Sequence, residues 1–300
     1  MVNPTKLKEK LTACISISGE MELYLFYENL FLKIIFSEEF PASDVPVETV
    51  ITPYDEISLK FVKDDGEFKC IDWCPLAAFL EVFYFFENHF PIANFDVRVF
   101  LKGFGRESAN LDFATGWLSR QDWKIRVLTF ICGEVRVNFG NFKKFFDNFP
   151  GCNTLHILGK RKPEWEYHFH PTVDSLVICN SCWVKMRDFL SIVSHRIVLN
   201  YITFTDSEIS QYVNHWGMTP EFRGHTLVEL DTMGRHFLNL DAIANGVVSG
   251  IAVEKDTESG KQQYTFRRAD GSSLKVHTSI ASIAEKASKI FFEFSYTSDS

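Results

Sequence analysis

The sequence lacks an uninterrupted apolar run long enough to cross a lipid bilayer, which needs about 20 residues. The most apolar stretches, residues 23–36 and 75–86, are broken by Glu28 and Lys33 and by Glu81. The N-terminus is only weakly apolar and has no clear small-residue cleavage site, so we read no signal peptide there. We therefore expect no membrane partner.

Positive charge is also scarce, because 31 Lys and Arg stand against 39 Asp and Glu, for a net charge of −8. Nucleic-acid binding relies on Lys and Arg to displace the counterions of phosphates. The densest basic cluster, residues 160–162, is short and is typical of a solvated turn. We expect no nucleic-acid partner.

Catalytic motifs are missing as well: the sequence has no phosphate-binding loop, zinc-protease motif or nucleophile elbow. One metal-like pattern is present, Cys179 and Cys182 with His168 and His170 upstream. There is no second such Cys pair, and Cys179 ends an apolar run, where a buried thiol is usual. We predict that the protein is not an enzyme and holds no cofactor and no metal; a zinc- or thiol-dependent enzyme is the alternative.

The seven cysteines are odd in number and scattered through a long chain. A disulfide framework is instead typical of small secreted domains. We therefore expect reduced thiols and an intracellular location, cytoplasmic or nuclear.

Apolar residues are abundant, at 46% of the chain, and 30 Phe stand against 9 Tyr. Phe carries no polar group, so most of these rings should be buried. Residues 11–69 are rich in β-branched and aromatic types and predict strands, and residues 75–89 predict a core helix opened by Pro75. The pattern changes near residue 95. We therefore divide the chain into a strand-rich N-terminal region (1–94), a strand/helix domain (95–295) and a frayed tail (296–300).

Short apolar runs recur in the second region and alternate with helical segments. The runs are residues 154–158, 175–179, 196–200 and 226–230, and the expected helices are 141–149, 185–193, 205–216 and 236–247. Thr205 and Glu208 form a capping-box pattern at the start of the third helix. The first three runs begin at evenly spaced positions and the fourth begins after a longer gap, which favours leucine-rich-repeat-like parallel units. An ordinary α/β sheet with helical crossovers is the alternative.

The end of the chain predicts antiparallel strands at residues 250–254, 261–268 and 273–277. Asp270-Gly271 lies between the last two and is a strong hairpin signal. Residues 280–292 predict a final amphipathic helix. The expected fold class is α/β (α+β), with irregular leucine-rich-repeat-like strand–helix units and antiparallel hairpins at both ends.

The second region also resembles a known family at a set of spaced hydrophobic and capping residues. The matching positions are Trp183, Phe189, Leu190, residues 197–199, Thr205, Asp206 and Trp216, and residues 264–271 resemble the family's closing hairpin with its Arg and Asp-Gly. Residues 120–280, and best 150–275, are similar to the type 2 F-box-associated domain of nematode F-box proteins.

This resemblance implies a substrate-recognition domain that binds a protein target in ubiquitin-dependent turnover. Family members usually carry an F-box, a helical bundle opened by a Leu-Pro pair, which docks on the adaptor subunit of an SCF ubiquitin ligase. Residues 1–40 predict strands instead, so we do not expect the SCF adaptor as a partner. The alternative is a free-standing interaction protein without the ligase link.

A partner surface follows from the alternation of side chains along parallel strands. One set of residues should meet the helices: Leu155, Ile157, Leu176, Ile178, Ile197 and Leu199. The opposite set mixes polar and apolar groups, which suits an interface. Together with the Pro-bounded loop at residues 160–171, it gives the predicted partner-binding residues His156, Trp165, Tyr167, His168, Val177, Asn200 and Glu229, with Val198 beside them.

Overall fold

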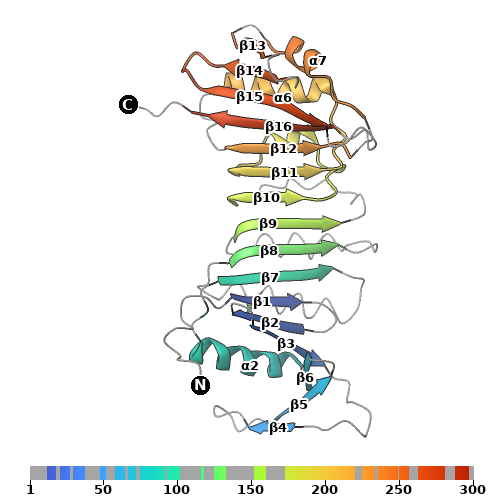
Figure 1. Ribbon diagram of the computed structural model, residues 1–300, viewed down its shortest axis with the longest axis vertical. Coiled ribbons are helices and arrows are strands. Elements are labelled where there is room, and N and C mark those ends of the chain that lie inside the picture. The colour runs from blue at the N-terminus through green and yellow to red at the C-terminus, as the bar shows by residue number, and fades with distance from the viewer. Residues whose placement is uncertain are drawn as a thin grey trace. The chain divides into compact units, whose positions relative to one another are not determined.

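The computed structural model has two compact units, residues 1–153 and 154–300. It describes residues 12–17, 21–27, 30–37, 48–51, 58–64, 67–71, 75–90, 92, 94–101, 116–117, 125–132, 152–159, 173–219, 225–233, 236–248, 250–256, 263–280 and 288–296. Each unit is a mixed α/β structure built on β-sheet (Figure 1).

The N-terminal unit orders its strands β8-β7-β1-β2-β3-β6-β5-β4. Their bounds are β1 (Thr12–Ile17), β2 (Met21–Tyr27), β3 (Leu30–Ser37), β4 (Glu48–Ile51), β5 (Ser58–Asp64), β6 (Glu67–Ile71), β7 (Asn94–Leu101) and β8 (Ile125–Cys132). β1 is antiparallel to β2 but parallel to β7. Helix α2 (Pro75–His89) contacts β2, β3 and β6, and the ring of Phe79 meets that of Phe36 edge-on at 5.4 Å.

The predicted strands of the N-terminal region and the predicted helix over residues 75–89 are confirmed within the described ranges. The helix is buried on one side only, since Phe79 and Phe83 are buried and Tyr84 is exposed. The division of the chain falls at residues 153 and 154, later than the change of pattern near residue 95. The reason is long-range pairing, because β7 and β8 extend the sheet alongside β1 and so belong to the N-terminal unit. The helix expected at residues 141–149 lies outside the described residues.

The C-terminal unit orders its strands β13-β14-β15-β16-β12-β11-β10-β9. The bounds are β9 (Cys152–Gly159), β10 (Ser175–Ile178), β11 (Arg196–Asn200), β12 (Leu227–Asp231), β13 (Ala252–Asp256), β14 (Gln263–Arg267), β15 (Ser273–Ile280) and β16 (Ser288–Ser295). β9 to β12 pair in parallel, whereas β16, β15, β14 and β13 continue antiparallel.

The even spacing of the first three runs in the sequence corresponds to the register in which the parallel strands pair. Leu155 is paired with Leu176, and Leu176 with Ile197, so the two steps across the sheet advance equally far along the chain. All three side chains are buried. The predicted parallel alignment of these runs is confirmed.

Three helices pack beside these strands: α5 (Met186–Phe189), α6 (Asp206–Met218) and α7 (Leu240–Asn245). The capping box of α6 is present, since the Glu208 amide donates to Thr205 Oγ1 at 3.3 Å and the Thr205 amide donates to Glu208 Oε2 at 2.8 Å. α5 is a single turn, shorter than expected. α7 is also shorter than the predicted helix, because Asn239 caps it through the Ala242 amide.

The helix predicted over residues 280–292 is wrong at the described residues, 280 and 288–292, and the rest of it, residues 281–287, lies outside the described ranges. Ile280 ends β15, and β16 begins at Ser288 and pairs with both β15 and β12. Burial in β16 alternates, with Ile290, Phe292 and Phe294 buried and Glu293 exposed, which is the period of a strand. The adjacent Phe291 and Phe292 disguise this alternation in the sequence.

A buried arginine ties the closing hairpin to α6. The Arg268 guanidinium lies 4.4 Å from the Trp216 ring centre, and its Nη2 donates to the carbonyl oxygens of Trp216 and, at 3.0 Å, of Thr219. A cation is favoured there because the last carbonyls of a helix carry partial negative charge. The hairpin itself closes through Gly271, whose φ is +85°, and the Arg268 amide donates to Ser272 O at 2.9 Å.

A buried histidine lies in the aromatic core beneath α6. The His225 ring is 6.3 Å from that of Tyr212 and 5.8 Å from that of Phe294, and its Nδ1 contacts the Ser194 carbonyl. Burial lowers the pKa of His225 below its usual range, although the Ser194 carbonyl partly opposes this. The folded protein therefore favours the neutral ring.

Shortening buried residues of the parallel strands, called ladder residues below, tests how these strands pack against the helices. Leu176→Ala and Leu199→Ala should each lower the free energy of unfolding by about 2–5 kcal/mol, because each leaves a cavity against the helices. Val193→Ala is the control, since Val193 is 66% exposed. Urea titrations followed by circular dichroism measure the difference, and ladder variants as stable as the control would contradict the packing.

His225 should make the protein less stable in mild acid. An unfolded histidine takes up its proton near pH 6.5, whereas the buried ring does so only at lower pH. As the pH falls below about 6.5, the unfolded state binds more protons and the free energy of unfolding decreases. Urea midpoints measured on either side of this pH should fall less steeply in His225→Gln than in wild type and in the exposed-site control His89→Gln. Equal slopes would contradict the assignment.

Candidate functional site

The two faces of the C-terminal sheet are covered differently. On one face, Tyr212 of α6 meets Phe292 at 5.4 Å between ring centres, and Phe189 of α5 packs on Tyr212 at 4.7 Å. The six ladder residues predicted for this face, from Leu155 to Leu199, are all buried. The opposite face is termed here the open face, and its central residues are His156, Val177, Val198, Asn200, Glu229, Asp231, His277, Lys289 and Phe291.

One row of the open face runs unbroken from β9 to β15. His156, Val177, Val198, Glu229, Phe291 and His277 are successive cross-strand neighbours along it. The His277 and Phe291 rings stack with centres 5.1 Å apart and planes 16° apart. Val198 is buried and the others are half-buried. The row therefore presents a mixed polar and apolar strip.

A charged cluster flanks this row. Lys289 Nζ lies 2.9 Å from Glu229 Oε1 and 3.4 Å from Asp231 Oδ2. The Asp231 carboxylate is nearly enclosed and also accepts from the Met233 amide at 2.8 Å. The hydrogen bond to Glu229 raises the pKa of Lys289, so the ammonium is retained. Two carboxylates share one cation, and the cluster keeps a net negative charge.

Two residues with positive φ follow the parallel strands at their carboxyl ends. Tyr201, directly after β11, has φ +61°, and Met233, just after β12, has φ +50°. Such backbone is uncommon for residues other than glycine and is often found at functional sites. Both residues turn the chain out of the sheet next to Asn200 and Asp231.

The thiols near this edge are poorly suited to catalysis or metal binding. Burial raises the pKa of Cys179, although a hydrogen bond with Asn200 opposes this, so little thiolate forms at neutral pH. Cys182 Sγ donates to Asn180 Oδ1 at 3.2 Å. Within the described ranges, no three His, Cys, Asp or Glu side chains are grouped to hold a metal ion. His168 and His170 lie outside those ranges.

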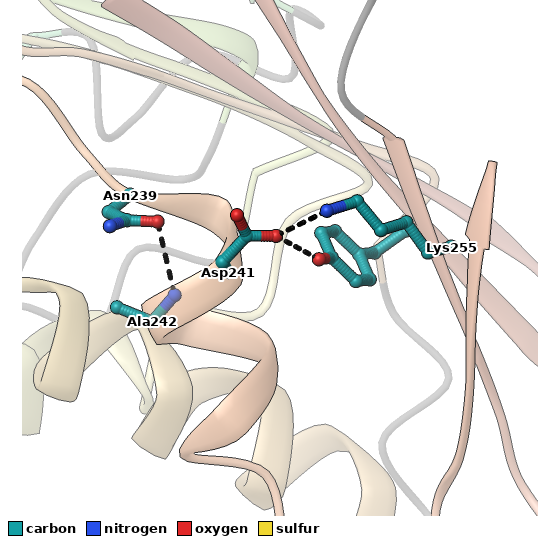
Figure 2. Close-up of polar contacts among 5 residues, drawn as sticks. Asn239, Asp241, Ala242 and Lys255 are labelled. Carbon is teal, nitrogen blue, oxygen red and sulfur yellow. Dashed lines mark hydrogen bonds and ion pairs between the residues drawn. The ribbon is translucent and has the colours of Figure 1, made fainter. Parts of the chain in front are cut away.

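A second polar cluster joins α7 to the closing strands. Figure 2 shows Asp241 Oδ1 accepting from Lys255 Nζ at 2.7 Å and from the Tyr264 hydroxyl, beside the Asn239 cap of α7. The hydrogen bond to Asp241 raises the pKa of Lys255, and burial raises that of Tyr264. Lys255 stays a cation and Tyr264 stays neutral, so the cluster is a structural clamp rather than a nucleophile.

Side chains that line the groove between α6 and α7 are also engaged in hydrogen bonds between the two helices. Its volume is about 350 Å³. Its lining residues are Asp206, Ser207, Ser210, Gln211, Asn214, Ala242 and Gly246. Asn214 donates to the Gly246 carbonyl at 3.0 Å and accepts from the Val248 amide at 2.9 Å, and Ser210 donates to the Ile243 carbonyl at 2.9 Å. These side chains hold the two helices together.

Four of the predicted partner-binding residues lie together on the open face: His156, Val177, Asn200 and Glu229. Trp165, Tyr167 and His168 lie outside the described residues. Sequence reasoning missed His277, Lys289 and Phe291, since the last two were assigned to a helix. The sequence of β16 holds no clear signal for them, because the adjacent Phe291 and Phe292 disguise the alternation of the strand.

Comparison with known proteins adds no identity to this site. The part of the chain that is described contains no helix both long and apolar enough to span a membrane. No family model, no curated protein and no solved structure matches the chain. Its function must therefore be argued from the arrangement of its own side chains.

Proposed function

We propose that the protein is a protein–protein interaction module whose partner binds the open face of the C-terminal unit. The observation that carries this proposal is the continuous row from His156 to His277, which crosses parallel and antiparallel strands on a sheet whose other face is fully packed. A rigid framework with one face against which no described helix packs offers a preformed surface at little entropic cost.

The chemistry of the row supports a protein partner. Protein interfaces combine an apolar centre with polar groups that fix orientation. Val177, Val198 and Phe291 supply apolar area along the row. Glu229, which lies between Val198 and Phe291, supplies charge together with its partner Lys289, and His156 supplies a hydrogen-bonding group at the end of the row. Stacking against His277 holds the Phe291 ring in place, which suits an anchor residue.

Leucine-rich-repeat-like units are the finer architecture that we propose for this surface. The equal, in-register steps from Leu155 to Leu176 and on to Ile197 support it. The next step, from Ile197 to Val228, is longer along the chain, so the units are irregular. An ordinary α/β sheet with helical crossovers is the alternative. The two architectures differ in whether the successive strand–helix units form a curved solenoid.

The resemblance to F-box-associated domains suggests that the partner is a substrate for ubiquitin-dependent turnover. The alternative is a free-standing interaction protein. The strands β1, β2 and β3, which lie between Thr12 and Ser37, support the alternative, because an F-box is helical. A zinc- or thiol-dependent enzyme is disfavoured by the raised pKa of Cys179.

Substitutions on the open face should separate binding from folding. Val177→Arg and Asn200→Arg should weaken the affinity for a recovered partner about tenfold or more, since each places a long charged side chain in the proposed contact. Thermal melts should stay close to wild type because neither residue belongs to the packed face. Val193→Arg, at an exposed position outside the strands, is the matched control.

Photo-crosslinking identifies the partner for that comparison. A benzophenone side chain introduced at position 177, but not at 193, should capture the same protein whose affinity the variants reduce. If both open-face variants bind that protein as tightly as the control does, the interaction lies elsewhere and the proposal fails.

Direct titration tests the ligase link. We expect weak or no binding of the purified SCF adaptor subunit to the chain, because β1 to β3 are strands whereas an F-box is helical. An F-box protein of known structure is the positive control. Sub-micromolar binding in calorimetry would establish the ligase connection and overturn the free-standing alternative.

A further inference from the structure

The N-terminal sheet has a face that α2 does not cover. Phe36 faces the helix through Phe79, and its cross-strand partner Met21 shares that face. Alternate residues of β2 and β3 therefore point the other way. These are Glu22, Tyr24, Phe26, Phe31, Lys33 and Ile35.

Three aromatic rings gather on this second face, two of them exposed and the third, Tyr24, half-buried. Phe26 and Phe31 are direct cross-strand partners with ring centres 5.3 Å apart, and Tyr24 lies 6.4 Å from Phe26 and 6.0 Å from Phe31. Phe31 is 59% exposed and Phe26 38%. Exposed clusters of large apolar side chains are typical of interaction sites.

One cation lies against the rings, and two more lie on neighbouring strands of the sheet. Lys33 Nζ lies 5.7 Å from the centre of the Tyr24 ring and 3.5 Å from Glu22 Oε1. Arg126 pairs with Asp96 through two bonds of 3.0 and 2.6 Å. Arg98 is exposed on β7 and forms no ion pair with any described residue.

The charge of this face runs against that of the chain. Among the described side chains of β1 to β3 and β6 to β8, four cations point to this face: Lys33, Lys69, Arg98 and Arg126. They stand against two carboxylates, those of Glu22 and Asp96. The face is therefore locally positive in a chain whose net charge is −8.

We infer that this aromatic and cationic face is a second binding surface, whose occupant is an acidic protein segment carrying an apolar anchor. Phe26 and Phe31 receive the anchor, and Arg98 and Lys33 attract its carboxylates. A nucleic acid is less suited, because it carries a phosphate at every nucleotide, and some of these would meet Glu22 and Asp96. A peptide can place an apolar side chain on Phe31 and limit its carboxylates to the positions near Arg98 and Lys33.

Peptide selection on the purified full chain tests this inference. A random peptide library displayed on phage should yield binders that combine Asp or Glu with Phe, Leu or Trp. Their affinity should fall about tenfold in Phe31→Ser, which removes the anchor contact, and in Arg98→Glu, and it should weaken as salt is raised.

Matched controls come from the C-terminal unit. Phe237→Ser alters a residue that is 58% exposed, and Arg187→Glu reverses an exposed charge, so both should keep full affinity. A benzophenone at position 31 should crosslink the selected peptide, whereas one at position 237 should not, which gives a readout that needs no destabilising substitution. Open-face variants such as Val177→Arg should also leave peptide binding unchanged.

Three outcomes would overturn the inference. The selection yields no binders, or the binders are not acidic, or Phe31→Ser and Arg98→Glu bind them as tightly as the controls do. Displacement of the peptides by single-stranded oligouridine, with direct binding of that probe, would instead assign the face to nucleic acid.

Discussion

The buried guanidinium of Arg268 connects the elements on which the C-terminal unit depends. It comes from the end of the closing hairpin and reaches the last carbonyls of α6, over the ring of Trp216. Enclosing a charge away from water is costly unless hydrogen bonds replace its hydration. Here the helix end supplies two acceptors for Nη2, and the Asp270 carboxylate lies 3.8 Å from Nη1, so hairpin and helix hold each other in place. The turn that leads into β15 is thereby held against the end of α6.

The placement of helices gives each face of that sheet a different task. Residues on the α6 side are buried aliphatic and aromatic groups whose packing sets stability. Residues on the other side are mostly half-buried and chemically mixed. Core packing does not fix their identity, so they can serve recognition. Because side chains alternate along a strand, a single residue of slippage would exchange the two sets. The in-register ladder of Leu155, Leu176 and Ile197 prevents such a slip.

Local sequence patterns predicted those parts of the fold that depend on local physics. The capping residues Thr205 and Glu208, the Asp270-Gly271 turn and the even spacing of the apolar runs are all visible in the sequence, and each corresponds to a feature of the structure. The helix expected at residues 280–292 failed because consecutive Phe residues satisfy both helical and strand periods, and only pairing with β12 and β15 decides between them. The exposure of the rings on β2 and β3 could not be predicted from the sequence either. Both strands carry large apolar residues on each face, and the position of α2 decides which face is covered.

The position of β1 has a consequence for how the chain folds as it is synthesised. β1 is the first described strand to leave the ribosome, and β2 can pair with it almost at once. Its other edge must wait for β7, since Thr12 is paired with Asn94. During that interval an apolar strand has an open edge available for incorrect partners. Closing so long a loop is also slow, so joining β1 to β7 is the step at which folding of the N-terminal unit competes with aggregation.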